Sequence, residues 1–328
     1  MIKIIEVKNR KDRKEFLNFP LRMYKDNPNF VPPLYADEKK MFTKKFAYND
    51  TCESAFFLAE KDGKTVGRIS AIIQKAANEK NNERRVRFTR FDCIDNEEVA
   101  KALFGAIEEY AAKKGMDTIC GPLGYSDLER EGLLIEGFDE LSTFEEQYNA
   151  EYYGRLIEAC GYKKEVDWVE SKIFLPEEKD IENIKKMSAF VKNRYGLRLP
   201  KCKNIKEFID KYADGFFDLL DDAYKDLYGT VPFSDSMKKM LMVNFKLVID
   251  IKHVTVVLNE KDEIVCLGLC FPSIGKALQK SGGKLTVPAL LRVLKAIKKP
   301  EIVDLGLIAV RADYLNCGVT AILAEGII

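Results

Sequence analysis

Hydrophobic and polar residues alternate along two adjoining stretches of the chain, Phe56–Glu60 and Thr65–Ile73. Alternation with a period of two places the apolar side chains on one face of a strand, and Asp62-Gly63 between the stretches favours a tight turn. The pattern therefore predicts a β-hairpin. A second hairpin is predicted at His253–Leu258 and Glu263–Phe271, where two apolar runs meet across charged turn residues.

A helical period is clearest over Asp95–Gly115. Apolar residues recur there every three or four positions, at Val99, Leu103, Ala106, Ile107 and Tyr110. Asp95 and Glu98 have the spacing of a capping box, and Gly115 stands where a glycine commonly ends a helix. The stretch therefore predicts an amphipathic helix.

The same signals predict the remaining elements. Further helices are expected at residues 11–26 (interrupted by Pro20), 149–160, 181–195, 204–228, 234–249, 288–298 and from Val319 onward. Further strands are expected at residues 85–93, 117–120, 166–175 and 302–310. Helices, a hairpin, a strand and a helix thus follow one another twice, on either side of a charged junction at Pro176–Asp180. We expect a mixed α/β protein (α+β, with mixed sheets) of two domains, residues 1–176 and 181–328.

Composition excludes several classes of function. The 53 basic and 52 acidic residues nearly cancel, so no overall field favours a nucleic acid or a membrane as partner. No signal-peptide core follows the N-terminus and no apolar run approaches membrane-spanning length, so we expect a cytoplasmic protein. The eight cysteines lack paired CxxC spacing and the single histidine, His253, lacks a partner cluster, so no metal site is expected.

Three segments of the sequence together resemble a known family. They are FLNFPLRMYKDNPNFVPPL, FFLAEKDGKTVGRISAI and residues 115–162, in which a strand runs into Gly121-Pro122, an acidic glycine-punctuated loop and a helix closed by Gly161. They resemble a bacterial family of GNAT-type acyltransferase-like proteins that carry two N-acetyltransferase-like folds in one chain. The resemblance runs nearly end to end. It implies two tandem GNAT-like folds, acetyl-CoA or another acyl-CoA as co-substrate, and a small-molecule or peptide amine as acceptor.

The resemblance also implies where the acyl-CoA would bind. In the wider superfamily, Arg/Gln-x-x-Gly-x-Gly/Ala joins a strand to a helix whose N–H groups hold the pyrophosphate, while the pantetheine pairs with the strand edge. The corresponding positions of the second half are Leu315, Gly318 and Thr320, of which only Gly318 keeps the motif. The candidate cofactor-binding residues are Ile308, Ala309, Val310, Asn316, Cys317, Gly318, Val319 and Thr320. The alternative is that Gly318 only makes the turn between strand and helix.

The corresponding junction of the first half, Phe91–Glu98, contains no glycine and four carboxylates. A phosphate there would meet like charge, which is unfavourable. We therefore interpret the first half as a non-catalytic copy, or as one remodelled to hold substrate. Arg85 and Arg87 share one face of a strand, where they either contact CoA phosphates or are ordinary exposed strand charges.

The loop at residues 121–140 and the helix after it supply the candidate substrate-binding residues, because ligands in α/β folds usually bind in loops at strand ends. These candidates are Tyr125, Ser126, Asp127, Asp139, Asn149, Tyr152 and Tyr153. The alternative is that the glycines shape the loop, that Asp139 or Asn149 caps a helix, and that the tyrosines pack in the core.

The sequence thus leads to two hypotheses of function. One is an acyl-CoA-dependent N-acyltransferase acting on an amine, and the other is a catalytically silent small-molecule-binding or scaffold protein on the same fold. Near-neutral charge disfavours a nucleic-acid binder. Asp304, Asp313 and Glu136 are possible general bases, and the sequence does not choose among them. Because the chain ends within a helix, we also expect the second fold to be incomplete at its C-terminus.

Overall fold

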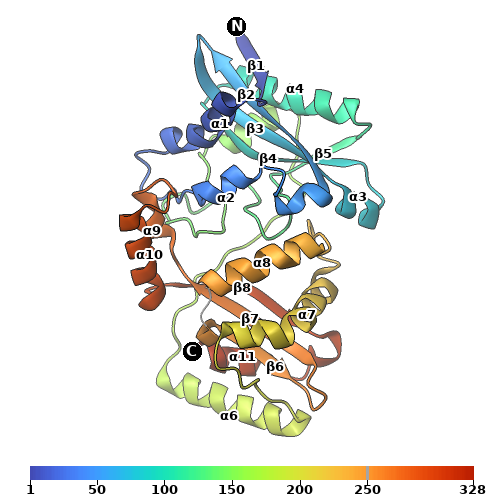
Figure 1. The fold of residues 1–328 in the computed structure, drawn as a ribbon, viewed down its shortest axis with the longest axis vertical. Helices are drawn as coiled ribbons and strands as arrows, with labels where there is room; N and C mark the ends of the chain where they lie inside the picture. Colours follow the sequence, from blue (N-terminus) through green and yellow to red (C-terminus); the bar gives the residue numbers. More distant parts are fainter. Residues whose placement is uncertain (249–250) are drawn as a thin grey trace. The chain divides into compact units, whose positions relative to one another are not determined.

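The computed structural model describes residues 1–248 and 251–328. The chain forms two compact units, Met1–Trp168 with Ile274–Lys295 and Val169–Ser273 with Ala296–Ile328 (Figure 1). The segment Ile274–Lys295, which the sequence analysis assigned to the second domain, therefore packs within the first unit. The contacts that hold it there join residues about 250 positions apart, such as Gln279 and Pro28, and no local pattern could indicate them.

The first unit is built on one five-stranded sheet. Its elements in chain order are β1 (Ile2–Glu6), α1 (Arg10–Met23), α2 (Tyr35–Lys40), β2 (Cys52–Lys61), β3 (Lys64–Gln74), α3 (Lys75–Asn81), β4 (Arg85–Cys93), α4 (Glu97–Lys113), β5 (Thr118–Cys120), α5 (Tyr153–Ala159), α9 (Gly275–Gln279) and most of α10 (Val287–Lys298). The strand order is β1-β2-β3-β4-β5, antiparallel throughout except for the parallel pair β4–β5.

Helices cover both faces of this sheet. Successive strand residues point to opposite faces, and the neighbours Phe56 and Phe57 of β2 show both layers. Phe57 joins the core beneath α4, whereas the Phe56 ring packs edge-to-face on Phe16 of α1, with 5.4 Å between ring centroids.

Both predicted hairpins are confirmed. In the first, β2 and β3 pair up to Lys61 and Lys64, and the turn between them has positive φ at Asp62 (51°) and Gly63 (74°). In the second, β6 (Val254–Leu258) and β7 (Ile264–Pro272) are antiparallel neighbours.

The helix predicted at residues 95–115 is α4, and its apolar stripe packs in the core as expected. Val99, Leu103 and Ile107 are fully buried. The predicted cap was wrong: Asn96 is the N-cap, and its side-chain oxygen accepts from the Val99 N–H at 3.1 Å. Asp95 instead forms an ion pair with Arg155.

Pro20 does not interrupt the first helix, contrary to the sequence analysis. Helix α1 continues through it to Met23. Because proline has no N–H, the carbonyl of Phe16, four residues earlier, loses its intrahelical donor. Arg68 Nη1 donates to that carbonyl at 3.0 Å, so a residue of β3 replaces the missing helical hydrogen bond.

The strand predicted at residues 166–175 is absent, and this segment has no regular secondary structure. Its apolar residues Ile173, Phe174 and Leu175 are exposed. Apolar residues alone do not make a strand, because the backbone also needs a neighbouring strand to pair with. The helix predicted at residues 149–160 begins later, at Tyr153.

The second unit has a three-stranded antiparallel sheet in the order β6-β7-β8. Its other elements are α6 (Glu178–Tyr195), α7 (Ile205–Tyr224), α8 (Asp235–Val248), β8 (Val303–Val310) and α11 (Thr320–Ile327). Helices α7 and α8 cover one face of the sheet, and α6 and α11 cover the other. Residue 249, the predicted end of the helix at 234–249, lies outside the described residues.

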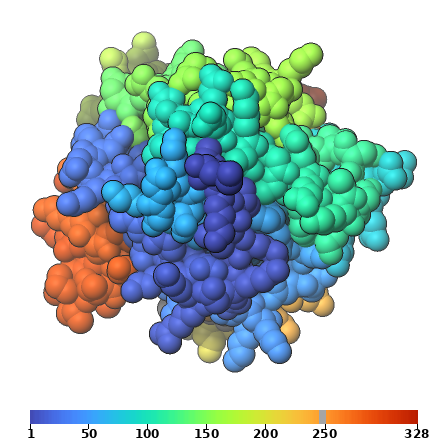
Figure 2. Space-filling view, turned by 90° about the horizontal axis from the view of Figure 1, so that it is seen from above, coloured from blue at the N-terminus to red at the C-terminus, as the bar shows by residue number. Residues whose placement is uncertain are grey.

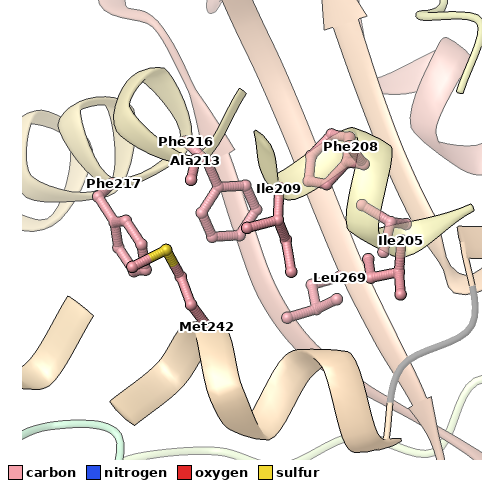
Figure 3. A pocket seen from close by; sticks show the side chains of 9 residues that line it. Ile205, Phe208, Ile209, Ala213, Phe216, Phe217, Met242 and Leu269 are labelled. Carbon is pink, nitrogen blue, oxygen red and sulfur yellow. The ribbon is translucent and has the colours of Figure 1, made fainter. Parts of the chain in front are cut away.

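A small cavity of about 20 Å³ lies between α7, α8 and β7, and Figure 3 shows the apolar side chains that surround it. Phe208, Ile209 and Phe216 of α7 meet Met242 of α8 and Leu269 of β7 there. A cavity of this size and lining is a packing defect of the core rather than a ligand site. Among the described residues, no helix is long and apolar enough to cross a membrane.

Candidate functional site

Tyr125 and Ser126 lie in the interior of the first unit. The Tyr125 ring stacks on Tyr48 with 5.3 Å between centroids, and the hydroxyls of Tyr48 and Ser126 share a hydrogen bond of 2.9 Å. Burial raises the pKa of both tyrosines. These contacts are those of packed core residues.

Tyr153 belongs to a buried network at the end of β4. Its hydroxyl donates to Asp92 Oδ1 (3.3 Å) and accepts from the Tyr24 hydroxyl (2.9 Å) and the Cys93 N–H (3.1 Å). Asp92 Oδ2 accepts from Arg68 Nε at 2.7 Å. Burial raises the pKa of Tyr153 and Tyr24 well above the ordinary value, so both remain hydrogen-bond donors. The network joins α1, β3, β4 and α5.

Three other candidates line one groove of the first unit, Asp139, Asn149 and Tyr152. The groove encloses about 770 Å³ and is completed by Asn27, Pro28, Asn29, Gly137, Phe138, Tyr148, Ala150 and Glu151. Its volume lies within the roughly 300–1,000 Å³ usual for small-molecule sites. Sequence reasoning found the loop side of the groove but missed Asn27–Asn29, which nothing in the local pattern distinguished from an ordinary turn.

The groove carries negative charge. Asp139 and Glu151 are exposed, and no basic residue is among the groove's described lining residues. Asn149 and Tyr152 are held in place, since Asn149 Oδ1 accepts from the Leu134 N–H (2.8 Å) and the Tyr152 hydroxyl donates to the Cys93 carbonyl (2.8 Å). A concave surface with two carboxylates attracts cationic ligands such as protonated amines.

Glu131 is a functional candidate that sequence reasoning missed. In the part of the chain that the structure describes, its Oε2 is buried without a hydrogen-bond partner. Burial, followed by the nearby charge of the half-buried Asp127, raises the pKa of Glu131 to about 8. Arg87 is buried on β4 opposite Cys120 of β5, where the pairing of the two strands ends. Its positive charge acts in the other direction and lowers the pKa of Glu131. Only a charged loop sequence surrounds Glu131, so no sequence signal marks it.

We expect Glu131→Gln to stabilise the protein at high pH. The folded-state pKa of about 8 exceeds the ordinary value of 4.5, so the folded chain binds more protons between these values and loses stability as the pH rises through that window. The variant should gain on the order of 2 kcal/mol at pH 8 and little at pH 5. Urea unfolding at both pH values measures this, with the exposed Glu136→Gln as the control. Parallel pH dependence in wild type and Glu131→Gln would contradict it.

The start of α4 does not suit a phosphate. Asn96 already accepts from an N–H of the first turn, and Asp95 and Glu97 both pair with Arg155 at this end of the helix. An incoming phosphate would meet these carboxylates.

The β8–α11 junction of the second unit has the opposite character. Gly318 has φ of +73°, which requires glycine for the turn itself, whereas the space beside it is open up to Val191 at 3.5 Å. Helix α11 starts without a side-chain cap, and residues 314–324 contain no charged residue. Asn316, Gly318 and Thr320 are exposed, Cys317 is half-buried, and Val319 and Ala309 are buried in the core.

The edge of β8 has a distinctive contact at Ile308. The Tyr224 hydroxyl donates to the Ile308 carbonyl at 2.9 Å and accepts from the Ile308 N–H at 3.2 Å. A single side chain thus satisfies both backbone groups that an adjacent strand or an extended ligand would bind. Two residues before, Gly306 lies at an irregularity in the pairing with β7, beneath the ring of Phe271.

The three possible general bases differ in their surroundings. Asp304, on β8, has a buried Oδ2 without a hydrogen-bond partner among the described residues, and burial raises its pKa. Asp313 is paired with Arg311, and hydrogen bonds from that guanidinium lower its pKa. Glu136 is exposed. Asp304 is therefore the carboxyl best suited to accept a proton.

The chain is similar to two curated proteins, and no protein-family model matches it. It is 30% identical to protein YghO of Escherichia coli over 233 residues, 69% of this chain and 57% of that protein. It is 28% identical over 291 residues to a protein named bacterial ceramide synthase from Caulobacter vibrioides, 87% of this chain and 73% of that protein. The chain thus spans little more than half the length of YghO.

A solved structure shows the same architecture. It is a tandem GNAT protein from the clavulanic acid biosynthesis pathway, solved without AcCoA, and it matches 99% of this chain and 84% of its own with a TM-score of 0.52 at 10% identity. The chain therefore has the fold of a tandem GNAT protein.

Proposed function

We propose that the protein is an acyl-CoA-dependent N-acyltransferase that transfers an acyl group to an amine. The observation that carries this proposal is the edge of β8, where a bindable backbone edge, a pairing irregularity at Gly306 and the buried carboxyl of Asp304 follow one another along one strand. The tandem GNAT fold supports the reaction class, and one relative is named bacterial ceramide synthase.

The acyl-CoA fits this strand and the helix after it. Its phosphates would lie at the uncharged start of α11, where the helix dipole favours an anion, although the Ala321 and Ile322 N–H groups already donate to the Gly318 and Val319 carbonyls. Its pantetheine arm would extend along the β8 edge past Val310 and Ile308, replacing the Tyr224 hydroxyl on the Ile308 backbone. The six-residue step from Val310 to Asp304 is about 20 Å in an extended strand, long enough for such an arm.

The reaction then needs only groups on this strand. The amine nitrogen attacks the thioester carbon, so a C–N bond forms and the C–S bond breaks. A backbone N–H freed by the irregularity at Gly306 would stabilise the oxyanion. Asp304 would accept the proton lost by the amine and return it to the departing thiolate, which leaves as the CoA thiol.

The acidic groove of the first unit is proposed as a separate binding site. Asp139 and Glu151 suit a ligand that carries a protonated amine. Asn149 and Tyr152 would contribute polar contacts to the rest of that ligand.

A catalytically silent binding protein is the second candidate. It is favoured by the Tyr224 contact, which already satisfies the strand edge at Ile308, and by the loss of two of the three motif positions at Leu315 and Thr320.

The decisive variant is Thr320→Asp, with Thr320→Asn as its matched control. An aspartate in the first turn of α11 interacts favourably with the helix dipole, so the variant should keep its fold. Its carboxylate repels phosphate, so acyl-CoA binding should weaken at least about tenfold. Thr320→Asn should stay within about twofold of wild type. Calorimetric titration of the chain with acetyl-CoA and palmitoyl-CoA measures both.

Two further variants separate binding from chemistry. Tyr224→Phe should strengthen acyl-CoA binding roughly threefold to tenfold by freeing the Ile308 backbone, whereas Tyr212→Phe on the same helix should not. Asp304→Asn should lower thiol release in the presence of amines about 100-fold with binding unchanged. Binding unaffected by Thr320→Asp would place the donor elsewhere, and binding without thiol release for any amine would favour the silent protein.

A further inference from the structure

The segment Ile274–Lys295 of the first unit is strongly basic. It contains Lys276, Lys280, Lys284, Arg292 and Lys295 and no acidic residue. The whole chain, by contrast, has a net charge of only +1. This stretch of the sequence is therefore far more basic than the chain as a whole, which the overall composition conceals.

Helix α10 in this segment presents an apolar stripe to solvent. Val287, Leu290, Leu291 and Leu294 recur at the i, i+3, i+4, i+7 spacing of one helix face, yet they are 74%, 44%, 63% and 51% exposed. The opposite side of the helix is the packed one, since Ala289 and Val293 are buried. The broader apolar face of α10 thus has no partner in the described part of the chain.

The segment is held firmly to the first unit. Gln279 Nε2 donates to the carbonyls of Pro28 (2.7 Å) and Phe30 (3.1 Å), and the Gly283 carbonyl accepts from the Tyr35 N–H at 3.0 Å. Arg292 Nε ties α10 to the Ala277 carbonyl of α9 at 3.2 Å. Figure 2 shows the segment in orange, beside blue N-terminal residues of the same unit. The exposed leucines are therefore displayed on an ordered support.

We infer that the outward face of α10 docks on the surface of an anionic lipid bilayer. Helices that lie in the membrane interface combine an apolar face with flanking lysines and arginines, which is the composition of this segment. Each basic side chain near the surface adds attraction to anionic headgroups. The inference goes beyond the proposed reaction and does not depend on it.

Charge decides between a bilayer and another copy of the chain. Pairing two copies through α10 would bring together two segments with five basic residues each and no acidic residue, which is electrostatically unfavourable. An anionic bilayer supplies the opposite charge and accepts the leucines at the same time.

The test is co-sedimentation of the full chain with vesicles. The protein should bind vesicles of phosphatidylcholine containing about a third phosphatidylglycerol, and vesicles of phosphatidylcholine alone at least about tenfold more weakly. Leu291→Gln/Leu294→Gln should lower binding to the anionic vesicles at least about tenfold. The control Leu227→Gln changes a 55% exposed leucine of the second unit. Its binding to the anionic vesicles should stay within about twofold of wild type.

Because the replaced leucines are exposed, thermal unfolding should be the same in all variants. Lys276→Glu/Lys280→Glu should bind the anionic vesicles more weakly than wild type. Added salt should weaken the binding of the wild-type chain to these vesicles in the same direction. No binding to anionic vesicles, or equal binding to both vesicle types, overturns the inference. So does a dimer in solution that Leu291→Gln/Leu294→Gln dissociates, because the face would then belong to a second copy.

Discussion

Replacing Arg68 with methionine should lower the free energy of unfolding of the first unit by about 3–5 kcal/mol. Arg68 and Asp92 are only 6% and 3% exposed, and their ion pair is 2.7 Å long. Removing the guanidinium leaves a buried carboxylate without its countercharge. It also removes Arg68 Nη1, which donates to the Phe16 carbonyl in place of the helical donor that is missing because of Pro20.

The control is a second arginine–aspartate ion pair in the first unit with nearly the same distance between its charged atoms. Arg84 and Asp117 are 2.6 Å apart, but their side chains are 68% and 53% exposed. Arg84→Met should therefore cost less than about 1 kcal/mol. Hydrogen exchange in graded denaturant, read peptide by peptide, reports the two units separately. A cost for Arg68→Met as small as that for Arg84→Met would show that the buried pair contributes little to the stability of the unit.

Gly283→Ala should detach the segment Ile274–Lys295 from the first unit, at a cost of about 3 kcal/mol. Gly283 has φ of +73°, and a Cβ there would lie 1.9 Å from the carbonyl oxygen of Pro33. That contact is with backbone, so neither side can move away without breaking the adjacent Tyr35–Gly283 hydrogen bond. The amides of α9 and α10 should then exchange rapidly while those of α4 remain protected.

The neighbouring glycine separates backbone strain from the clash. Gly282 also has positive φ, at +58°, but a Cβ there would meet only the side chain of Leu21, at 3.5 Å. Gly282→Ala should therefore cost only about 1 kcal/mol and leave the segment protected. Equal exchange in the two variants would mean that the segment is not held at Gly283. The comparison also tests whether α10 needs its support to bind vesicles.

The elements that depend on local periodicity were predictable. The apolar stripe of α4 identified the helix because residues three and four apart share one face whatever lies opposite. The hairpins β2–β3 and β6–β7 were predictable because strands joined by a short turn pair with each other. The helix cap was predicted one residue too early, since Asp95 and Asn96 are adjacent and both residue types can cap. Only the packing of Arg155 on Asp95 distinguishes them.

The site was only partly predictable. Asp139, Asn149 and Tyr152 were identified from a loop at a strand end. Their partners Asn27 and Asn29 come from a segment more than 100 residues away, so no spacing in the sequence relates the two sides. Glu131 and Asp304 were distinguished from other carboxylates only by burial without a partner, a property that depends on the whole surrounding fold.

By itself, then, the sequence determined the longer helices and the two hairpins, because a backbone period of two or 3.6 residues requires matching apolar positions. The tertiary structure decided which segments find partners. Residues 166–175 are rich in apolar residues but pair with no strand among the described residues, and α10 has a core-like stripe that faces solvent. Whether each segment finds a packing partner depends on contacts between distant parts of the chain, and a local periodic pattern holds no information about such contacts.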